Sequence, residues 1–141
     1  PEMHPQAETF DQDIQRFTEK VNAGANSAIT QFFFNPDAYF YFLDRLQKQG
    51  ITIPVAPGIM PITNASNLIR FADGTGAEIP RWIRKQLQAY GDDSRSIRAF
   101  GHEVILKLCE RLIDGGAPSL HFYTMNTTEP TRQLVVDLGL N

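Results

Sequence analysis

Apolar side chains recur at helical spacing in six stretches of the chain. Phe10, Ile14, Phe17 and Val21 lie three or four positions apart, so they share one face of a helix, and Gly24 follows as a stop signal. The same spacing, together with capping and stop residues, predicts five further helices, within residues 36–50, 63–71, 80–91, 97–112 and 134–138.

Three shorter segments have the composition of β-strands. Residues 28–34 form a nearly continuous apolar run, which predicts a parallel strand covered on both faces. Residues 51–56 and 119–124 predict the second and third strands. Residues 57–61, Pro-Gly-Ile-Met-Pro, predict a loop at the end of the second strand, and residues 73–78 predict another loop.

The alternation of helix and strand predicts an α/β fold, with a parallel sheet covered by helices. Three strands could form a small open domain or part of a closed barrel, and the pattern alone does not separate the two. Gln31, the 57–61 loop and the pair Asn126 and Thr127 lie at or just after the carboxyl ends of the strands. In α/β folds, sites are built at that edge.

The composition indicates a folded, water-soluble domain of 141 residues, with 42% hydrophobic and 21% charged residues. This length is too short for a complete (β/α)₈ barrel, which needs at least about 200 residues. A net charge of −3 without blocks of like charge predicts neither a nucleic-acid partner nor a membrane partner. We expect a cytoplasmic protein. The single cysteine, Cys109, lies among leucines and is expected to be a packed thiol.

Five strings in this order resemble methylenetetrahydrofolate reductase, and they span the whole chain. They are Pro1-Glu2-Met3-His4-Pro5, Ala23-Gly24-Ala25-Asn26, Ala28-Ile29-Thr30-Gln31-Phe32-Phe33-Phe34, Pro57-Gly58-Ile59-Met60-Pro61-Ile62 and His121-Phe122-Tyr123-Thr124-Met125-Asn126. The resemblance implies one domain, residues 1–141, corresponding to the second half of a (β/α)₈ TIM barrel. The family's catalytic acid is then expected upstream of Pro1, and no catalytic residue is assigned within the chain.

The resemblance also implies that FAD is the cofactor. The matching positions, expected to contact FAD, are His4 and Ala7 in the first string and Asp13, Arg16 and Lys20 on the first helix. Their spacing independently places those three helical side chains beside the apolar stripe, where they could meet phosphates and a ribose. Arg16 stands where relatives often have Asn. Glu19 replaces a commonly basic residue, which predicts weaker phosphate binding there.

Three residues match substrate-binding positions of the family. Gln31 is an amide in an apolar strand and needs a hydrogen-bond partner; the resemblance implies that it contacts folate or nicotinamide. Phe71 matches an aromatic residue that stacks on either substrate. Asn67 stands one turn earlier, where the family uses Gln, and Thr127 stands where relatives commonly carry Arg. No metal site is expected, because His102 and His121 have no second ligand at suitable spacing.

The implied activity belongs to one-carbon metabolism and methionine biosynthesis: NADH or NADPH reduces FAD, which then reduces 5,10-methylenetetrahydrofolate to 5-methyltetrahydrofolate. An alternative is that this polypeptide is an inactive half barrel that self-associates or pairs with the other half. Open strand edges and an unclosed apolar interior favour such association. The expected partners are therefore folate, a nicotinamide nucleotide and either a second copy or the missing half.

Overall fold

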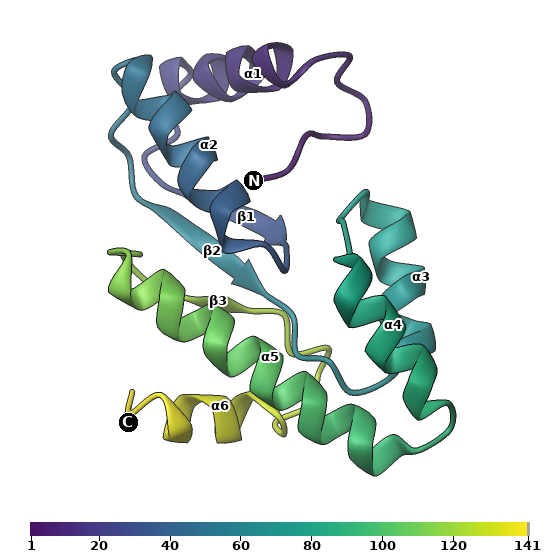
Figure 1. Cartoon of the computed structure of the whole chain (residues 1–141). Helices are drawn as coiled ribbons and strands as arrows, with labels where there is room; N and C mark the ends of the chain where they lie inside the picture. The colour runs from purple at the N-terminus through teal and green to yellow at the C-terminus, as the bar shows by residue number, and fades with distance from the viewer. Residues whose placement is uncertain (141) are drawn as a thin grey trace.

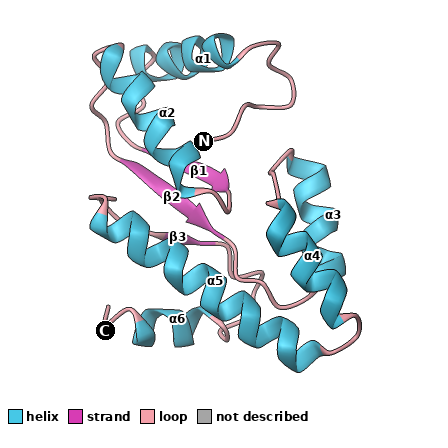
Figure 2. Ribbon diagram, in the orientation of Figure 1, coloured by secondary structure: helices cyan, strands magenta, loops and turns pink. Residues whose placement is uncertain are grey.

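The computed structural model describes residues 1–140 as an α/β domain (Figures 1 and 2). The described residues contain six helices and three strands. In chain order these are α1 (Phe10–Asn22), β1 (Ala28–Phe32), α2 (Pro36–Lys48), β2 (Val55–Ile59), α3 (Ala65–Thr75), α4 (Arg81–Tyr90), α5 (Ser94–Asp114), β3 (His121–Phe122) and α6 (Thr131–Asp137).

The three strands form one parallel sheet in the order β1-β2-β3. Ala28 pairs with Val55, and Gly58 pairs with Phe32 on one side and His121 on the other. The predicted α/β class with parallel strands is therefore confirmed. Helix α1 lies beside α2, whereas α5 lies beside α6 at the other end of the sheet (Figure 1).

The predicted position of the second strand was wrong. The strand shares only Val55 and Ala56 with the predicted residues 51–56 and runs to Ile59, so Pro57 and Gly58 belong to the centre of the sheet rather than to a loop. Gly58 is required because a Cβ atom there would lie 2.7 Å from Cε2 of Tyr123 and still closer to the carbonyl oxygen of Thr30. Turn-type residues here permit close packing instead of forming a turn.

The ends of three other elements also differ from their predicted positions. Helix α3 extends to Thr75, so the predicted loop at 73–78 begins only after the left-handed Gly76. The third strand is reduced to His121 and Phe122. The first strand ends at Phe32, two residues before the end of its apolar run. Burial of side chains in a loop explains that error, because Phe33 and Phe34 are buried although they are outside the strand.

The core lies between the sheet and helices α2 and α5. Tyr39 of α2 is completely buried, and its hydroxyl donates to the carbonyl of Val55 at 2.8 Å. Its ring stacks on Phe33 at 5.9 Å. Cys109 of α5 is also completely buried, which confirms the expected packed thiol. These contacts fix the helical layer against the buried face of the sheet.

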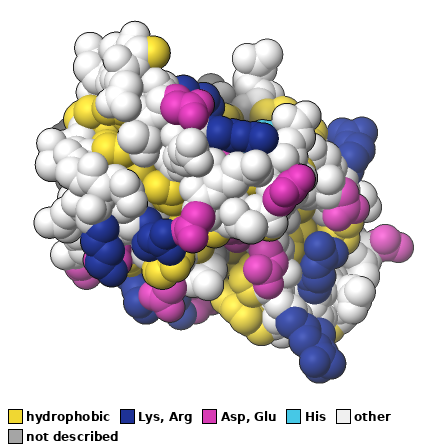
Figure 3. Space-filling model, turned by 90° about the horizontal axis from the view of Figure 1, so that it is seen from above, with side chains coloured by type: hydrophobic (Ala, Val, Ile, Leu, Met, Phe, Trp, Pro, Cys, Tyr) yellow, Lys and Arg dark blue, Asp and Glu magenta, His cyan; other side chains and the backbone are white. Residues whose placement is uncertain are grey.

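The opposite face of β1 is open, contrary to the expectation that both faces are covered. Thr30 and Phe32 are buried, whereas Gln31 is exposed and Ile29 is 56% exposed. An apolar residue can therefore lie in the centre of a strand without a covering partner. Across the described residues, no helix combines the length and apolar character needed to cross a membrane. Figure 3 shows basic and acidic side chains interspersed over the face seen from above.

Candidate functional site

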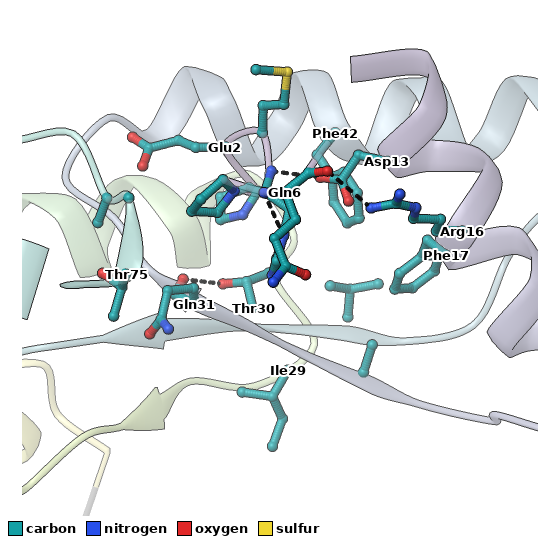
Figure 4. A pocket seen from close by; sticks show the side chains of 18 of the residues that line it. Glu2, Gln6, Asp13, Arg16, Phe17, Ile29, Thr30, Gln31, Phe42 and Thr75 are labelled. Atoms are coloured by element: carbon teal, nitrogen blue, oxygen red, sulfur yellow. Dashed lines mark hydrogen bonds between the residues drawn. The ribbon is translucent and has the colours of Figure 1, made fainter. Parts of the chain in front are cut away.

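One cavity has a volume of about 930 Å³ and opens beside β1 (Figure 4). Its walls come mainly from the segment 1–6, the face of α1 toward β1, strand β1 and the end of α3 with the residues that follow it, and Phe42 of α2 and Val55 of β2 complete them. Five predicted site residues line it, namely His4, Asp13, Arg16, Lys20 and Gln31. The fold thus brings together residues that are up to 27 positions apart in sequence, from His4 to Gln31.

Helix α1 carries three of these side chains because its cap and its apolar stripe fix its rotation. The hydroxyl of Thr9 accepts from the N–H of Gln12 at 3.2 Å and starts the helix. Ile14 is buried, and Phe17 packs edge-on against Phe42 at 5.4 Å. The polar face that remains, with Asp13, Arg16 and Lys20, therefore borders the cavity.

The segment 1–6 is held against α1 by hydrogen bonds. Oδ2 of Asp13 accepts from the backbone N–H of His4 at 3.0 Å, and Arg16 donates to the carbonyl of Gln6 at 3.4 Å. Nδ1 of His4 accepts from the N–H of Gln6 at 3.1 Å. When His4 is neutral its proton must then be on Nε2, which leaves that nitrogen as a donor.

The same segment is also attached to the connection between α3 and α4. Oε2 of Glu2 accepts from the N–H of Glu78 at 2.9 Å, across 76 positions of sequence. Burial raises the pKa of Glu2, although the Glu78 N–H acts in the opposite direction. Pro5 packs on Gly76, where a Cβ would lie 2.6 Å from Cγ of Pro5. Segment 1–6 therefore bridges α1 and the end of α3.

Gln31 has a partner, as its amide chemistry requires, but that partner is its own neighbour. Oε1 of Gln31 accepts from the N–H of Phe32 at 3.1 Å. The premise of a buried amide was wrong, since the residue lies on the open side of the sheet. Within residues 1–140, Nε2 makes no hydrogen bond, so Gln31 reaches the cavity with its donor end unpaired.

The charges around the cavity are mixed. Arg16 and Lys20 are the cations, and the carboxylates of Glu2, Asp13 and Glu19 also line it. One oxygen of Asp13 is engaged by His4, which leaves Oδ1 for another donor. This arrangement suits a ligand that has both anionic groups and hydroxyl donors.

The remaining predicted residues lie outside this cavity. Ala7 is buried behind it, with its N–H donating to the carbonyl of His4 at 2.9 Å. Asn67 is exposed and accepts from Arg70 at 3.3 Å, while the Arg70 guanidinium lies 5.2 Å from the Phe71 ring centre. Helix α3 nevertheless reaches the cavity through its last turn, since Gly74 and Thr75 line it.

A second cavity, of about 490 Å³, lies between α5, α6 and the loops after β2 and β3. Thr127, His102 and Arg98 are among its lining residues. His102 Nε2 lies 2.7 Å from Oδ2 of Asp137, which joins α5 to α6. Within residues 1–140, no group of three or more His, Cys, Asp or Glu side chains could hold a metal ion.

Sequence reasoning missed Tyr123. Its hydroxyl, just after β3, donates to the carbonyl of Thr30 in β1 at 2.9 Å, across β2. Thr30 itself was also missed, and its hydroxyl accepts from the N–H of Gly58 at 2.9 Å. The glycine in the 57–61 string was the available signal, because a strand glycine often marks a close approach.

Comparisons with known proteins agree over nearly the whole chain. Residues 1–139 match the family model described as methylenetetrahydrofolate reductase. The 5,10-methylenetetrahydrofolate reductase of Escherichia coli strain K12 is 36% identical over 140 residues, covering 99% of this chain and 47% of that protein. A probable methylenetetrahydrofolate reductase (NADPH) of Caenorhabditis elegans is 38% identical over 138 residues, covering 97% of this chain and 21% of that protein.

A solved structure supports the fold. It is an uncharacterized protein from Clostridium thermocellum, described as binding two copies of 5-methyl-5,6,7,8-tetrahydrofolic acid. The TM-score is 0.60 at 19% identity, and the match covers 93% of this chain and 48% of the other. This chain thus spans about half the length of the Clostridium thermocellum protein and about half the length of the Escherichia coli reductase.

Proposed function

Because this chain belongs to the methylenetetrahydrofolate reductase family, we propose that it forms part of an enzyme that reduces 5,10-methylenetetrahydrofolate to 5-methyltetrahydrofolate, with FAD as cofactor and NADH or NADPH as hydride source. The observation that carries this proposal is the convergence of His4, Asp13, Arg16, Lys20 and Gln31 on one cavity. The names of the relatives, which are methylenetetrahydrofolate reductases, agree with the proposed reaction.

The size and lining of the cavity fit a flavin dinucleotide. Cofactor sites usually have volumes of about 300–1,000 Å³ and combine apolar walls with a few convergent polar groups. This cavity, at about 930 Å³, has Phe17, Phe42 and Ile29 as apolar walls beside two cations. The G-x-G-x-x-G fingerprint is absent from the sequence, and we assign diphosphate binding to side chains of the cavity.

The side chains of α1 take distinct roles in this proposal. Lys20 and Arg16 bind the diphosphate, and the second oxygen of Asp13 accepts from a ribose hydroxyl. Nε2 of His4 donates to the cofactor, while Ala7 supports the turn that presents His4. When bound, FAD supplies the hydride chemistry. Glu19 lies close to this anionic group and weakens phosphate binding by repulsion.

Folate and the nicotinamide nucleotide bind in turn against the cofactor. Gln31 contacts either one, and Asn67 and Phe71 add contacts from α3. Since Asn67 and Phe71 do not line the cavity here, substrate has to extend along α3 to reach them. No proton donor is assigned to residues 1–141, and the acid is expected from the other half of the barrel.

We place residues 1–141 as one unit, the second half of a (β/α)₈ barrel. Parallel strands in sequential order support this placement, because barrels add strands in that order. The open face of β1 is consistent with a partner that covers it, either the other half of the barrel or another copy of the chain in an oligomer. A cytoplasmic location fits a reductase of one-carbon metabolism and methionine biosynthesis.

A second candidate is an inactive half barrel that associates through this open face. The observation that favours it is Ile29, which is 56% exposed in the middle of β1. In that case the 15.9 kDa chain binds neither flavin nor folate without its partner. Colourless protein that associates but shows no half-reaction supports this candidate over the first.

The deciding experiment uses the complete gene product. Purified protein should show flavin absorbance, lose it anaerobically with NADH or NADPH, and regain it when 5,10-methylenetetrahydrofolate is added. Gln31→Glu and Phe71→Ala should slow both half-reactions while flavin stays bound. Asp13→Ala should instead weaken flavin binding, because it releases segment 1–6, whereas Asp44→Ala on α2 serves as the matched control. Equal flavin loss in all four variants would contradict the assigned roles.

A further inference from the structure

Strand β1 departs from regular pairing at the residues that carry Gln31. Its register with β2 shifts between Ile29 and Phe32. There the hydroxyl of Thr30 accepts from the N–H of Gly58 at 2.9 Å and donates to the carbonyl of Gln31 at 2.8 Å. The side chain of Gln31 accepts from Phe32 at 3.1 Å. The Thr30 side chain therefore replaces a backbone acceptor in the pairing with Gly58, and Gln31 satisfies the neighbouring N–H of its own strand.

Tyr123, which directly follows β3, fixes this irregular segment. Its hydroxyl donates to the Thr30 carbonyl at 2.9 Å, passing over Gly58, where any Cβ would collide with its ring. His121 packs edge-on against the same ring at 4.9 Å, and Phe32 does so at 6.4 Å. The carbonyls of Thr30 and Gln31 are thus both held, the first by Tyr123 and the second by the Thr30 hydroxyl.

We propose that Tyr123 is a positioning residue that acts through Thr30 to hold the Gln31 amide with Nε2 toward the ligand, so that Gln31 recognises a carbonyl oxygen. The Phe32 N–H must face the amide oxygen, which leaves only the donor end for the ligand. A pterin and a nicotinamide both present such a carbonyl. This inference rests on the proposed function, because it concerns the same substrates.

Tyr123 itself is not placed in contact with the ligand. It does not line the cavity, whereas Thr30 and Gln31 do. Its effect on binding must therefore pass through the β1 segment. Removal of its hydroxyl should leave the Thr30 carbonyl without this donor and allow the bulge to relax. We predict that ligand affinity falls by the contribution of about one hydrogen bond.

A double-mutant cycle on the flavin-loaded complete protein tests this coupling, with the dissociation constant for 5-methyltetrahydrofolate measured by titration. Tyr123→Phe should weaken binding roughly five- to tenfold in the wild-type background. In the Gln31→Ala background the same change should weaken it less than about twofold, because the group it positions is gone. Equal losses in both backgrounds would overturn the inference and leave the proposed function intact.

Failure of the wild-type protein to bind 5-methyltetrahydrofolate would instead overturn the proposed function, and this inference with it. Tyr90→Phe is the matched control: within residues 1–140 that hydroxyl makes no hydrogen bond, and the ring packs against Phe100 at 5.9 Å. It should leave the dissociation constant unchanged. A loss equal to that of Tyr123→Phe would count against the positioning role.

A second pair of variants covers the case in which Tyr123→Phe does not fold. Thr30→Ser keeps the hydroxyl and should retain binding within about twofold. Thr30→Val keeps the shape, loses both hydroxyl bonds and should weaken binding by roughly tenfold. Amide exchange at Gly58 should accelerate in the Val variant only, since that N–H bonds to the Thr30 hydroxyl. Equal binding by the two variants would contradict the proposal.

Discussion

At the scale of single residues, Gly58 is the most constrained position of the sheet. It is buried between Thr30 on one strand and Tyr123 on the other, and a methyl group there would lie 2.7 Å from the Tyr123 ring. Neither neighbour can retreat easily, because the Thr30 carbonyl is main chain and the Tyr123 hydroxyl is bonded to it. The requirement for glycine here is steric.

We therefore expect Gly58→Ala to lower the free energy of unfolding by about 2–3 kcal/mol, which urea titration would measure. Gly74→Ala is the control, since a Cβ there meets nothing within 4 Å in helix α3. The Gly74→Ala change should raise the free energy of unfolding by about 0.5 kcal/mol, because alanine has a higher helix propensity than glycine. Similar effects of the two substitutions would refute the steric explanation.

Cys109 offers a second residue-scale prediction. Burial raises the pKa of its thiol to about 12, so at pH 8 roughly one thiol in ten thousand is ionised. Labelling of the native 141-residue chain by a disulfide reagent should therefore be slow at pH 8 and complete in urea. The chain has only this cysteine, so the signal is unambiguous. Rapid labelling of the folded protein would show that the Cys109 thiol in α5 is accessible and would contradict this prediction.

At the residue scale, helical spacing and the family strings led to candidate site residues, whose contacts with FAD and substrate stay predictions. Asp13, Arg16 and Lys20 follow from the spacing of α1, and they do line one cavity with Gln31. The Tyr123–Thr30 bond could not be foreseen, because it joins residues 93 positions apart across a third strand. Only the folded sheet brings them together.

At the scale of elements, amphipathic stripes identified all six helices of residues 1–140, whereas strand boundaries were less accurate. Pro57 and Gly58 suggested a loop because proline and glycine are rare in strands. In β2 they are tolerated, since the Thr30 side chain supplies the pairing at Gly58. Local propensity was overridden by a tertiary contact that the sequence pattern does not display.

Helix α3 depends on its cap, and this gives a prediction for an element. The side chain of Asn64 accepts from the N–H of Asn67 at 2.9 Å at the start of the helix. Asn64→Ala should lower stability by about 1 kcal/mol in thermal or urea unfolding, while Asn64→Asp should retain most of it. Ser66→Ala, in the first turn, is the control and should have little effect. Equal losses for Ala and Asp at position 64 would argue against a capping role.

At the scale of the whole molecule, one layer of helices covers one face of a three-stranded sheet. The other face of β1 presents Ile29, and both outer strands have an unpaired edge within the described residues. Such surfaces promote association. The sequence alone predicted both faces of β1 to be covered, because an apolar run does not show which parts of the polypeptide supply the cover.

The 141-residue chain by itself is therefore expected to self-associate, as measured by sedimentation equilibrium. Ile29→Lys should shift the population toward the 15.9 kDa monomer, because it places a charge in the open face. Val136→Lys makes the same chemical change on the exposed surface of α6 and should leave the distribution unaltered. A wild-type chain that remains monomeric at high concentration would disprove the expectation.

The bulge in β1 has a consequence for how this fold can vary. Backbone hydrogen bonds between strands survive almost any substitution, because every amino acid except proline carries the same N–H and C=O groups. Between β1 and β2, however, the N–H of Gly58 donates to the side chain of Thr30. A single codon change can therefore delete a rung of this sheet, which makes strand pairing beside the cavity directly accessible to natural selection.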